Sequence, residues 1–207
     1  MMDVYDEVLV KIVDYVLNPP EFSITAKQNA CWSFLDALGC GILALNFPAC
    51  TKLLGPVVSG AFCEAGSRVP GCDWELDPVQ AAFNIGTMVR WLDYNDTWLA
   101  AEWAHPSDNL GAILAVTDFV YRRQQPHMTL EAVIDAMIMA YEIQGVLAIN
   151  HAFNRQGLDH VILVKLASAL VAAKLLGGDR DMLLRCASQV FVDGQSLRTY
   201  RHAPNTG

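Results

Sequence analysis

The sequence has few charged residues and no run of lysines or arginines. Charged residues make up 17% of the 207 residues, and the formal net charge at pH 7 is -8. Nucleic-acid-binding proteins gain most of their affinity from basic side chains that neutralise phosphates. The composition therefore excludes nucleic acid as an expected partner.

A long uncharged apolar run is also missing. The most apolar stretch, residues 161–176, contains Lys165 and Lys174, whereas a membrane-spanning helix needs about 18 or more consecutive apolar residues. The first seven positions carry three acidic residues, where a signal or transit peptide would carry basic ones. We therefore expect a cytoplasmic protein with no membrane partner.

The cysteines form no CxxC pair, although the chain has six of them. They stand at Cys31, Cys40, Cys50, Cys63, Cys72 and Cys186. Zinc knuckles and iron–sulfur loops require closely spaced thiolates, so neither kind of site is expected. The sequence predicts buried free thiols, no metal and no cofactor.

Apolar residues recur at helical spacing along most of the chain, and no segment shows convincing strand alternation. Helices are expected at about residues 3–17, 25–45, 77–92, 107–123, 129–150, 161–176 and 179–193. Hydrophobic residues make up 53% of the chain, which excludes a disordered acidic protein and predicts a large interface. The predicted fold class is all-α, a helical bundle.

Capping residues mark where these helices begin. Asp77 precedes a proline at the first helical position, which is typical of a helix start. Thr25 and Gln28 have the spacing of a capping box. The remaining predicted starts are Asp3, Ser107, Thr129 and Asp179. Pro48 begins a short turn, and residues 56–77 read as a long loop rich in glycine and proline.

Polar side chains gather at three places where predicted helices begin or end. These places are residues 93–108, 159–160 and 198–202. The first contains the side chains of Asp93, Asp96, Thr97, Glu102, His105 and Asp108, with Trp98 and Trp103 between them and Trp91 just before them. Because binding groups are concentrated on loops held by a rigid scaffold, we expect chemistry there.

The first polar segment imitates the opening of a calcium-binding EF-hand loop, with Asp93, Asn95 and Thr97 at alternate positions. The sixth position of such a loop must be glycine and the twelfth a bidentate glutamate. Here these positions are Trp98 and Ala104. An EF-hand is therefore excluded.

Two further interpretations of this segment stay open on the residues alone. Asp93, Asp96 and His105 could hold a metal ion, although their spacing matches no established ligand motif. Alternatively, Asp93 and Asp108 cap helices, and His105 is an ordinary loop histidine. A longer pattern distinguishes the functional interpretation from these two.

Three long strings of the sequence resemble the MmgE/PrpD family. They are RWLDYNDTWLAAEWAHPSDN at residues 90–109, GLDHVILVKLAS at 157–168 and QSLRTYRHAPNTG at 195–207. LDALGCGILAL, ACTKLLGP and LDPVQAAFNIG resemble the same family nearer the amino terminus. The resemblance covers essentially all 207 residues.

The resemblance implies one helical domain over residues 1–207, a cytoplasmic homodimer and a lyase activity. The expected reaction is the dehydration of 2-methylcitrate, a tricarboxylate, to 2-methyl-cis-aconitate in the methylcitrate cycle of propionate breakdown. Family chains are longer and continue into a second, α/β domain that this chain lacks. We therefore expect the chain to be an incomplete amino-terminal portion that is weakly active or inactive alone.

The family resemblance also implies catalytic residues. Asp93, Thr97, His105 and His160 match pocket positions of the family. A carboxylate and an imidazole can transfer protons near neutral pH, which suits a metal-independent acid–base elimination. His160 precedes an apolar helix, whose amino-terminal amides favour an anion. The sequence leaves open which residue is the base.

The negative charge of the substrate requires cations, and Arg198, Tyr200, Arg201 and His202 form the densest basic cluster of the chain. Arginine binds carboxylates through two parallel hydrogen bonds. These four residues are the expected substrate-binding set. Lys165 is interpreted instead as a paired or snorkelling lysine outside the site.

Two alternatives to dehydration remain. A cis-aconitate decarboxylase of the same family shares the Asp93, Thr97 and histidine framework, and aconitate hydration is a related activity. The segment between Thr97 and His105 is longer here than in the decarboxylase pattern, and RTYRHAPNTG resembles the dehydratase, which favours dehydration. The non-enzymatic alternative is a helical dimerisation fragment.

Overall fold

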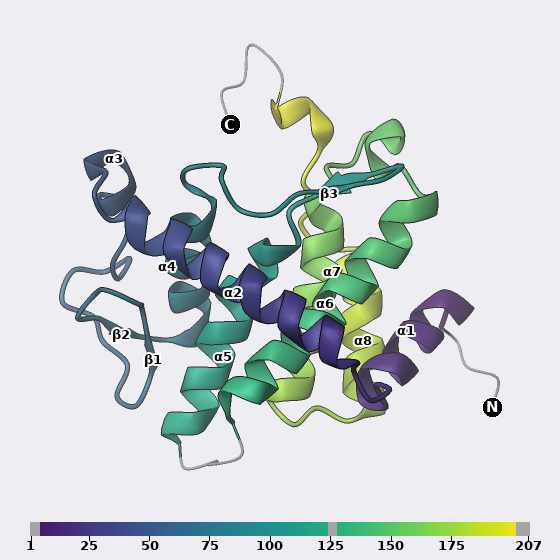
Figure 1. Ribbon diagram of the computed structural model, residues 1–207, viewed down its shortest axis with the longest axis horizontal. Helices are drawn as coiled ribbons and strands as arrows, with labels where there is room; N and C mark the ends of the chain where they lie inside the picture. The colour runs from purple at the N-terminus through teal and green to yellow at the C-terminus, as the bar shows by residue number, and fades with distance from the viewer. Residues whose placement is uncertain (1–4, 124–127, 202–207) are drawn as a thin grey trace. The chain divides into compact units, whose positions relative to one another are not determined.

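The computed structural model describes residues 5–123 and 128–201, which are mainly helical (Figure 1). The α-helices are α1 (Glu7–Leu17), α2 (Ile24–Ala44), α3 (Pro48–Thr51), α4 (Pro78–Arg90), α5 (Leu110–Arg122), α6 (Leu130–Asn150), α7 (Val161–Leu175) and α8 (Arg180–Val190). Short 3-10 helices are η1 (Pro106–Asn109), η2 (Phe153–Gln156) and η3 (Arg198–Arg201). The predicted all-α class is confirmed.

Four strands of two residues each form two antiparallel hairpins. They are β1 (Ser67–Arg68), β2 (Glu75–Leu76), β3 (Trp98–Leu99) and β4 (Trp103–Ala104), paired β1 with β2 and β3 with β4. None of them was predicted, because a strand of two residues is too short to show alternation. Each hairpin nevertheless gives a defined conformation to a segment whose structure the spacing of apolar residues does not predict.

The chain divides into two compact units. The first contains the described parts of residues 1–20, 97–106 and 139–207, and the second contains residues 21–96 and the described parts of 107–138. Helix α6 therefore contributes residues to both units.

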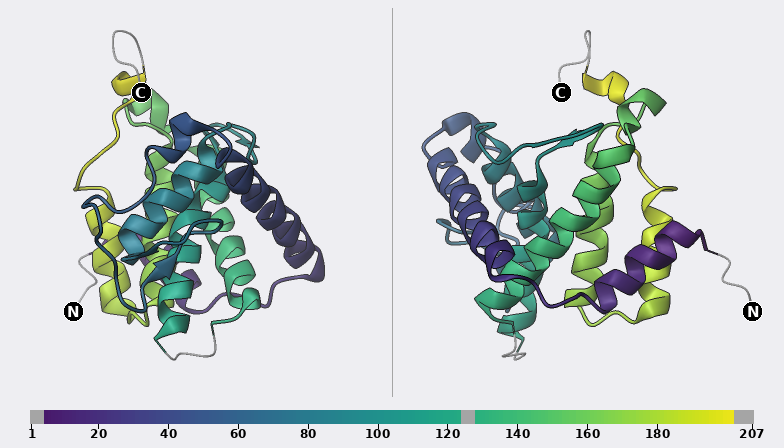
Figure 2. Two further views of the ribbon diagram at one scale, coloured as in Figure 1. Left: turned by 90° about the vertical axis from the view of Figure 1, so that its left-hand side faces the viewer. Right: turned by 45° about the vertical axis from the view of Figure 1, so that its right-hand side comes forward.

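Helix α7 forms the core of the first unit. Leu163, Leu166 and Leu170 on this helix are fully buried, as expected for a helix that is apolar on all sides. Helices α1 and α8 pack against it, and the right-hand view of Figure 2 shows α1 lying across α8. Lys165 of α7 donates to the carbonyl oxygens of Val190, at 3.1 Å, and Asp193. It is thus a paired lysine, as predicted.

In the second unit, α4 packs against α2 and α5. The β1–β2 hairpin is held to α5 by Arg68, whose backbone nitrogen donates to Asp118 Oδ2 at 2.8 Å and whose guanidinium donates to Oδ1 at 2.6 Å. Burial raises the pKa of Asp118, but the hydrogen bonds and charge of Arg68 outweigh it and lower that pKa below its usual value.

Helices α4 and α5 approach each other closely at Gly111. A Cβ atom at this position would lie 2.7 Å from the carbonyl oxygen of Ala82 and 3.0 Å from the backbone nitrogen of Gly86. A Cβ atom at Gly86 would meet no described heavy atom within 4 Å. The two glycines therefore form a matched pair for measuring how close the helices are.

We expect Gly111→Ala to lower the free energy of unfolding by about 1–3 kcal/mol, because its methyl group would collide with backbone atoms. Gly86→Ala should raise it by up to about 1 kcal/mol, since alanine favours a helix more than glycine does. Chemical denaturation of both variants measures the difference. Two variants of equal stability would contradict the close approach.

Three predicted helix starts are confirmed by their capping hydrogen bonds. Asp77 Oδ1 accepts from the backbone nitrogens of Val79 and Gln80 at 3.0 and 3.1 Å. Asp179 accepts from Met182 at 2.8 Å. Thr129 accepts from the nitrogen of Ala132 at 3.3 Å. These caps are local, so the sequence alone identifies them.

Three other predicted starts are wrong. Helix α2 is capped by Ser23, whose extended backbone lets its hydroxyl accept from the nitrogen of Ala26 at 3.1 Å, and Thr25 lies inside the helix. Helix α1 begins after Asp6, and Asp3 lies outside the described residues. Ser107 belongs to η1, and α5 begins after it.

The prediction of buried thiols is correct only in part. All six cysteines are free, and Cys40 and Cys50 are buried. Cys31 is exposed on α2, and the remaining three are half-buried. Burial raises the pKa of the Cys50 thiol, which makes this thiol a poor nucleophile.

Among the described helices, α6 is the one long and apolar enough to cross a membrane by length and composition. Its most apolar window has a mean hydropathy of 1.6, and 61% of that window is buried inside the structure. Core helices of soluble proteins pass the same test. Helix α6 is therefore weak support for a membrane span, and the cytoplasmic location stays a prediction.

Candidate functional site

The β3–β4 hairpin brings Thr97 and His105 together. The strands pair Trp98 with Ala104 and Leu99 with Trp103, so the residues just outside the ladder face each other. Thr97 Oγ1 lies 3.4 Å from His105 Nδ1. Two residues that are eight positions apart thus become direct neighbours.

A second histidine lies beside the same hairpin, across the ring of Trp103. The ring centroid of Trp103 is 5.6 Å from that of His105 and 3.9 Å from that of His160. The two imidazole centroids are 6.3 Å apart. His105 is 6% exposed and His160 is 1% exposed. The first unit therefore holds two buried imidazoles around one tryptophan.

Asp159 lies beside His160, and Arg198 lies beside Asp159. One carboxylate oxygen of Asp159 lies 3.1 Å from His160 Nδ1, and the other lies 3.6 Å from a guanidinium nitrogen of Arg198. The guanidinium carbon of Arg198 is 5.9 Å from the centre of the Trp103 ring. Of the four predicted substrate-binding residues, Arg198 is thus the one that faces the carboxylate beside His160.

The other predicted binding residues are placed less directly. Tyr200 lies in η3 with an exposed side chain, and its backbone nitrogen donates to the carbonyl oxygen of Leu197 at 3.0 Å. Arg201 is the last residue of η3. His202 lies outside the described residues.

Glu102 is a buried carboxylate at the tip of the hairpin. No role was predicted for it from the sequence. It is 0% exposed and accepts from the backbone nitrogens of Trp103, at 3.2 Å, and Asn154, at 2.8 Å. The side-chain nitrogen of Asn154 also donates to it at 2.9 Å. Glu102 therefore fixes the hairpin that carries Thr97 and His105.

Asp93 belongs to the second unit, whereas the histidine cluster lies in the first. Its side chain is 71% exposed and forms an ion pair with Arg90. Its backbone is left-handed, with φ at 56°, a conformation that aspartate adopts more readily than most residues. The contacts of Asp93 within its unit are those of a loop residue at the end of α4.

The remaining acidic residues of the segment have structural hydrogen bonds in the second unit. Asp96 Oδ1 accepts from the backbone nitrogen of Ser107 at 3.0 Å. The side-chain nitrogen of Asn95 donates to Ser107 Oγ at 2.9 Å and to Asp108 Oδ1 at 3.1 Å. Across residues 5–123 and 128–201, no group of three or more histidine, cysteine or acidic side chains is arranged to hold a metal ion.

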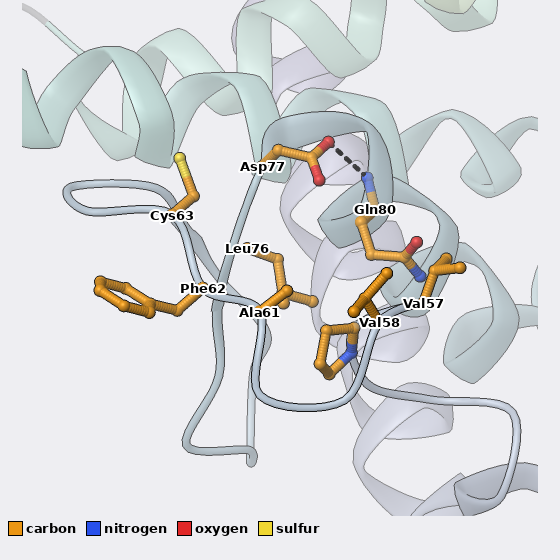
Figure 3. Close-up of a pocket in the computed structure, with 9 residues that line it drawn as sticks. Val57, Val58, Ala61, Phe62, Cys63, Leu76, Asp77 and Gln80 are labelled. Atoms are coloured by element: carbon orange, nitrogen blue, oxygen red, sulfur yellow. Dashed lines mark hydrogen bonds between the residues drawn. The ribbon is translucent and has the colours of Figure 1, made fainter.

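The loop predicted at residues 56–77 encloses a separate hollow in the second unit, of about 270 Å³ (Figure 3). Its lining is mainly apolar and includes Val57, Val58 and Phe62. Asp77 is the charged group at its edge, and Figure 3 shows this carboxylate bonded to the backbone of Gln80 as a helix cap. The hollow therefore offers less acid–base chemistry than the histidine cluster.

Comparison with known proteins gives a family match and several close relatives. Residues 10–207 match the MmgE/PrpD N-terminal domain. The chain is 58% identical to the 2-methylcitrate dehydratases of Salmonella typhimurium and Cupriavidus necator, and 52% identical to the mitochondrial 2-methylcitrate dehydratase of Yarrowia lipolytica. These alignments cover 98%, 98% and 97% of the chain, but 43%, 43% and 40% of the respective relatives. The chain thus spans less than half the length of these relatives.

Proposed function

The chain belongs to the MmgE/PrpD family, and from this premise we propose that the protein carrying it is a hydro-lyase that dehydrates 2-methylcitrate to 2-methyl-cis-aconitate. The observation that supports this most is the burial of His105 and His160 around Trp103, inside the family-matched residues. The names of the relatives support the substrate.

Dehydration of such an acid is an elimination that needs a base and an acid. The base removes a proton from the carbon beside a carboxylate, the electron pair of that C–H bond forms the C=C bond, and the C–O bond breaks. The acid protonates the departing hydroxide, which leaves as water. We assign these two proton transfers to His105 and His160, because imidazole can do both near neutral pH.

Thr97 and Asp93 have supporting roles in this proposal. The hydroxyl of Thr97, 3.4 Å from His105 Nδ1, can orient that imidazole or hydrogen-bond the substrate hydroxyl. For Asp93 the support is the family resemblance alone. The proposed elimination requires no metal, because the side chains supply both the acid and the base.

The carboxylates of the substrate are proposed to bind the basic cluster of Arg198, Tyr200, Arg201 and His202. Arg198 already faces the carboxylate of Asp159 at 3.6 Å, so part of its charge is matched within the chain. We therefore assign the larger share of substrate binding to Arg201 and Tyr200.

We also propose that the full-length protein is a homodimer, and light scattering of that protein tests this.

The assay for this proposal incubates the full-length, chelator-treated protein with 2-methylcitrate and identifies the product by mass spectrometry. We expect loss of water and a conjugated acid, with citrate as a slower substrate. Release of carbon dioxide from cis-aconitate would favour the decarboxylase instead, and a strict metal requirement would contradict the metal-free mechanism. Residues 1–207 alone should turn over substrate poorly, because the relatives are more than twice as long.

A further inference from the structure

Gly145 lies in the interior of α6, where glycine destabilises a helix relative to alanine. It is buried, and the proposed reaction gives it no role. A Cβ atom at this position would lie 3.5 Å from Trp98 Cζ2 and 3.6 Å from Trp98 Cε2. The indole of Trp98 therefore lies directly against the backbone of α6, where a larger side chain would project.

A hydrogen bond holds the same hairpin to α6 at a second point. The backbone nitrogen of Glu102, at the hairpin tip, donates to the carbonyl oxygen of Ala148 at 2.9 Å. Ala148 lies in the last turn of α6, whose carbonyl groups lack partners within the helix. It is three positions after Gly145, and residues three apart are neighbours on a helix surface. One face of α6 thus carries the β3–β4 hairpin at two points.

The contact with α6 and the candidate site lie on opposite faces of the hairpin. Successive side chains of a strand point to opposite faces, and Trp98 points toward Gly145. The ring of His105 lies beside that of Trp103, two positions earlier, with centroids 5.6 Å apart. Thr97 Oγ1 is 3.4 Å from His105 Nδ1. The distance between the Trp98 ring and α6 therefore determines where the Thr97–His105 pair lies.

We propose that Gly145 is a positioning residue, and that the contact between its backbone and the Trp98 ring holds Thr97 and His105 in place for the reaction. The inference rests on the proposed function of His105. A displacement of about 1 Å in a reacting group can lower a rate by about 10²-fold. A packing contact behind the hairpin therefore affects the rate without touching the substrate.

The test uses a graded series of side chains at position 145 in the full-length protein. Gly145→Ala should keep kcat for 2-methylcitrate within about twofold of wild type, because its methyl group would make an ordinary contact. The longer side chain of Gly145→Leu extends into the Trp98 ring, so kcat should fall by about 10–10²-fold with little change in KM. Both limbs of the pH profile should remain, because both imidazoles are still present.

A second substitution distinguishes displacement of the hairpin from damage to the helix. Trp98→Phe removes the outer ring of the indole, which lies against Gly145. Added to Gly145→Leu, it should raise kcat again by about fivefold or more.

The matched control is Val146→Leu, which enlarges the next side chain of α6, 63% exposed. This variant should keep the kcat of wild type. Wild-type kcat in folded Gly145→Leu, or equal losses in Gly145→Leu and Val146→Leu, would overturn the inference.

A measurement without turnover separates this inference from the proposed function. Hydrogen–deuterium exchange of residues 97–106, followed by mass spectrometry, reports how firmly the hairpin is held. Exchange should be about tenfold faster in Gly145→Leu, because the hydrogen bond from Glu102 to Ala148 is weakened, and unchanged in Val146→Leu. An inactive wild type would defeat the dehydratase proposal, whereas wild-type exchange in Gly145→Leu would overturn the role of Gly145. If Gly145→Leu fails to fold, Gly145→Val takes its place in both measurements.

Discussion

Replacing His105 with alanine in the full-length protein is expected to lower kcat for 2-methylcitrate by about 10²–10⁴, the usual contribution of a general acid or base. His105 and His160 are the buried imidazoles of the candidate site, and His160→Ala should have an effect of the same order. Removing either imidazole leaves one of the two proton transfers without its donor or acceptor.

The pH dependence of kcat/KM distinguishes the two histidines. Wild type should show a bell-shaped profile, with one limb for the base and one for the acid. Each alanine variant should lose the limb of the histidine it lacks, which assigns the acid and the base. Asp93→Asn, measured beside them, tests whether this residue titrates in the reaction.

His151→Ala provides the matched control for both variants. His151 lies in the same unit, just after α6, with an exposed side chain near Phe153. This substitution should leave kcat and the pH profile unchanged. Wild-type kcat in His105→Ala, together with correct folding by circular dichroism, would refute its assignment as an acid or base.

Local sequence was sufficient to predict most of the helices. Asp77 and Asp179 cap their helices with bonds to residues two or three positions ahead, so the information lies within one helical turn. The predicted starts of α1 and α2 were wrong by a few positions, because several nearby residues are able to cap a helix. Only the backbone conformation selects one of them, as at Ser23.

The candidate site was predicted as a set of residues but not as an arrangement. Thr97 meets His105 through a hairpin whose strands are too short to recognise by alternation. Arg198 meets Asp159 across 39 positions, a pairing for which the sequence has no local signal. Family resemblance selected residues at these positions, and the folded chain determines which of them touch.

Glu102 shows the same limitation. The sequence places it among polar residues at a helix junction, yet its main partner, Asn154, is 52 positions away. A contact at that separation leaves no periodic pattern. Its complete burial could not be predicted from the sequence either, since glutamate is among the residues least often buried.

Glu102→Ala is the substitution for which we expect the largest loss of stability. It removes the acceptor of three N–H groups, two from Asn154 and one from Trp103. The three hydrogen bonds are part-buried, and a donor left without a partner away from water costs about 1–3 kcal/mol, so the free energy of unfolding should fall by about 3–5 kcal/mol. Glu131→Ala removes an exposed carboxylate paired with Lys27 and should leave the unfolding midpoint unchanged.

A double-mutant cycle tests whether the loss arises at the contact between Glu102 and Asn154. If the contact carries the effect, Asn154→Ala should add little to Glu102→Ala, with an interaction energy of about 0.5–3 kcal/mol. Additive losses would mean that the two side chains stabilise the protein separately.

Because Glu102 fixes the hairpin that brings Thr97 to His105, Glu102→Ala should also lower kcat under conditions where the variant is folded. Full kcat in that folded variant would show that the hairpin holds the pair without its buried carboxylate.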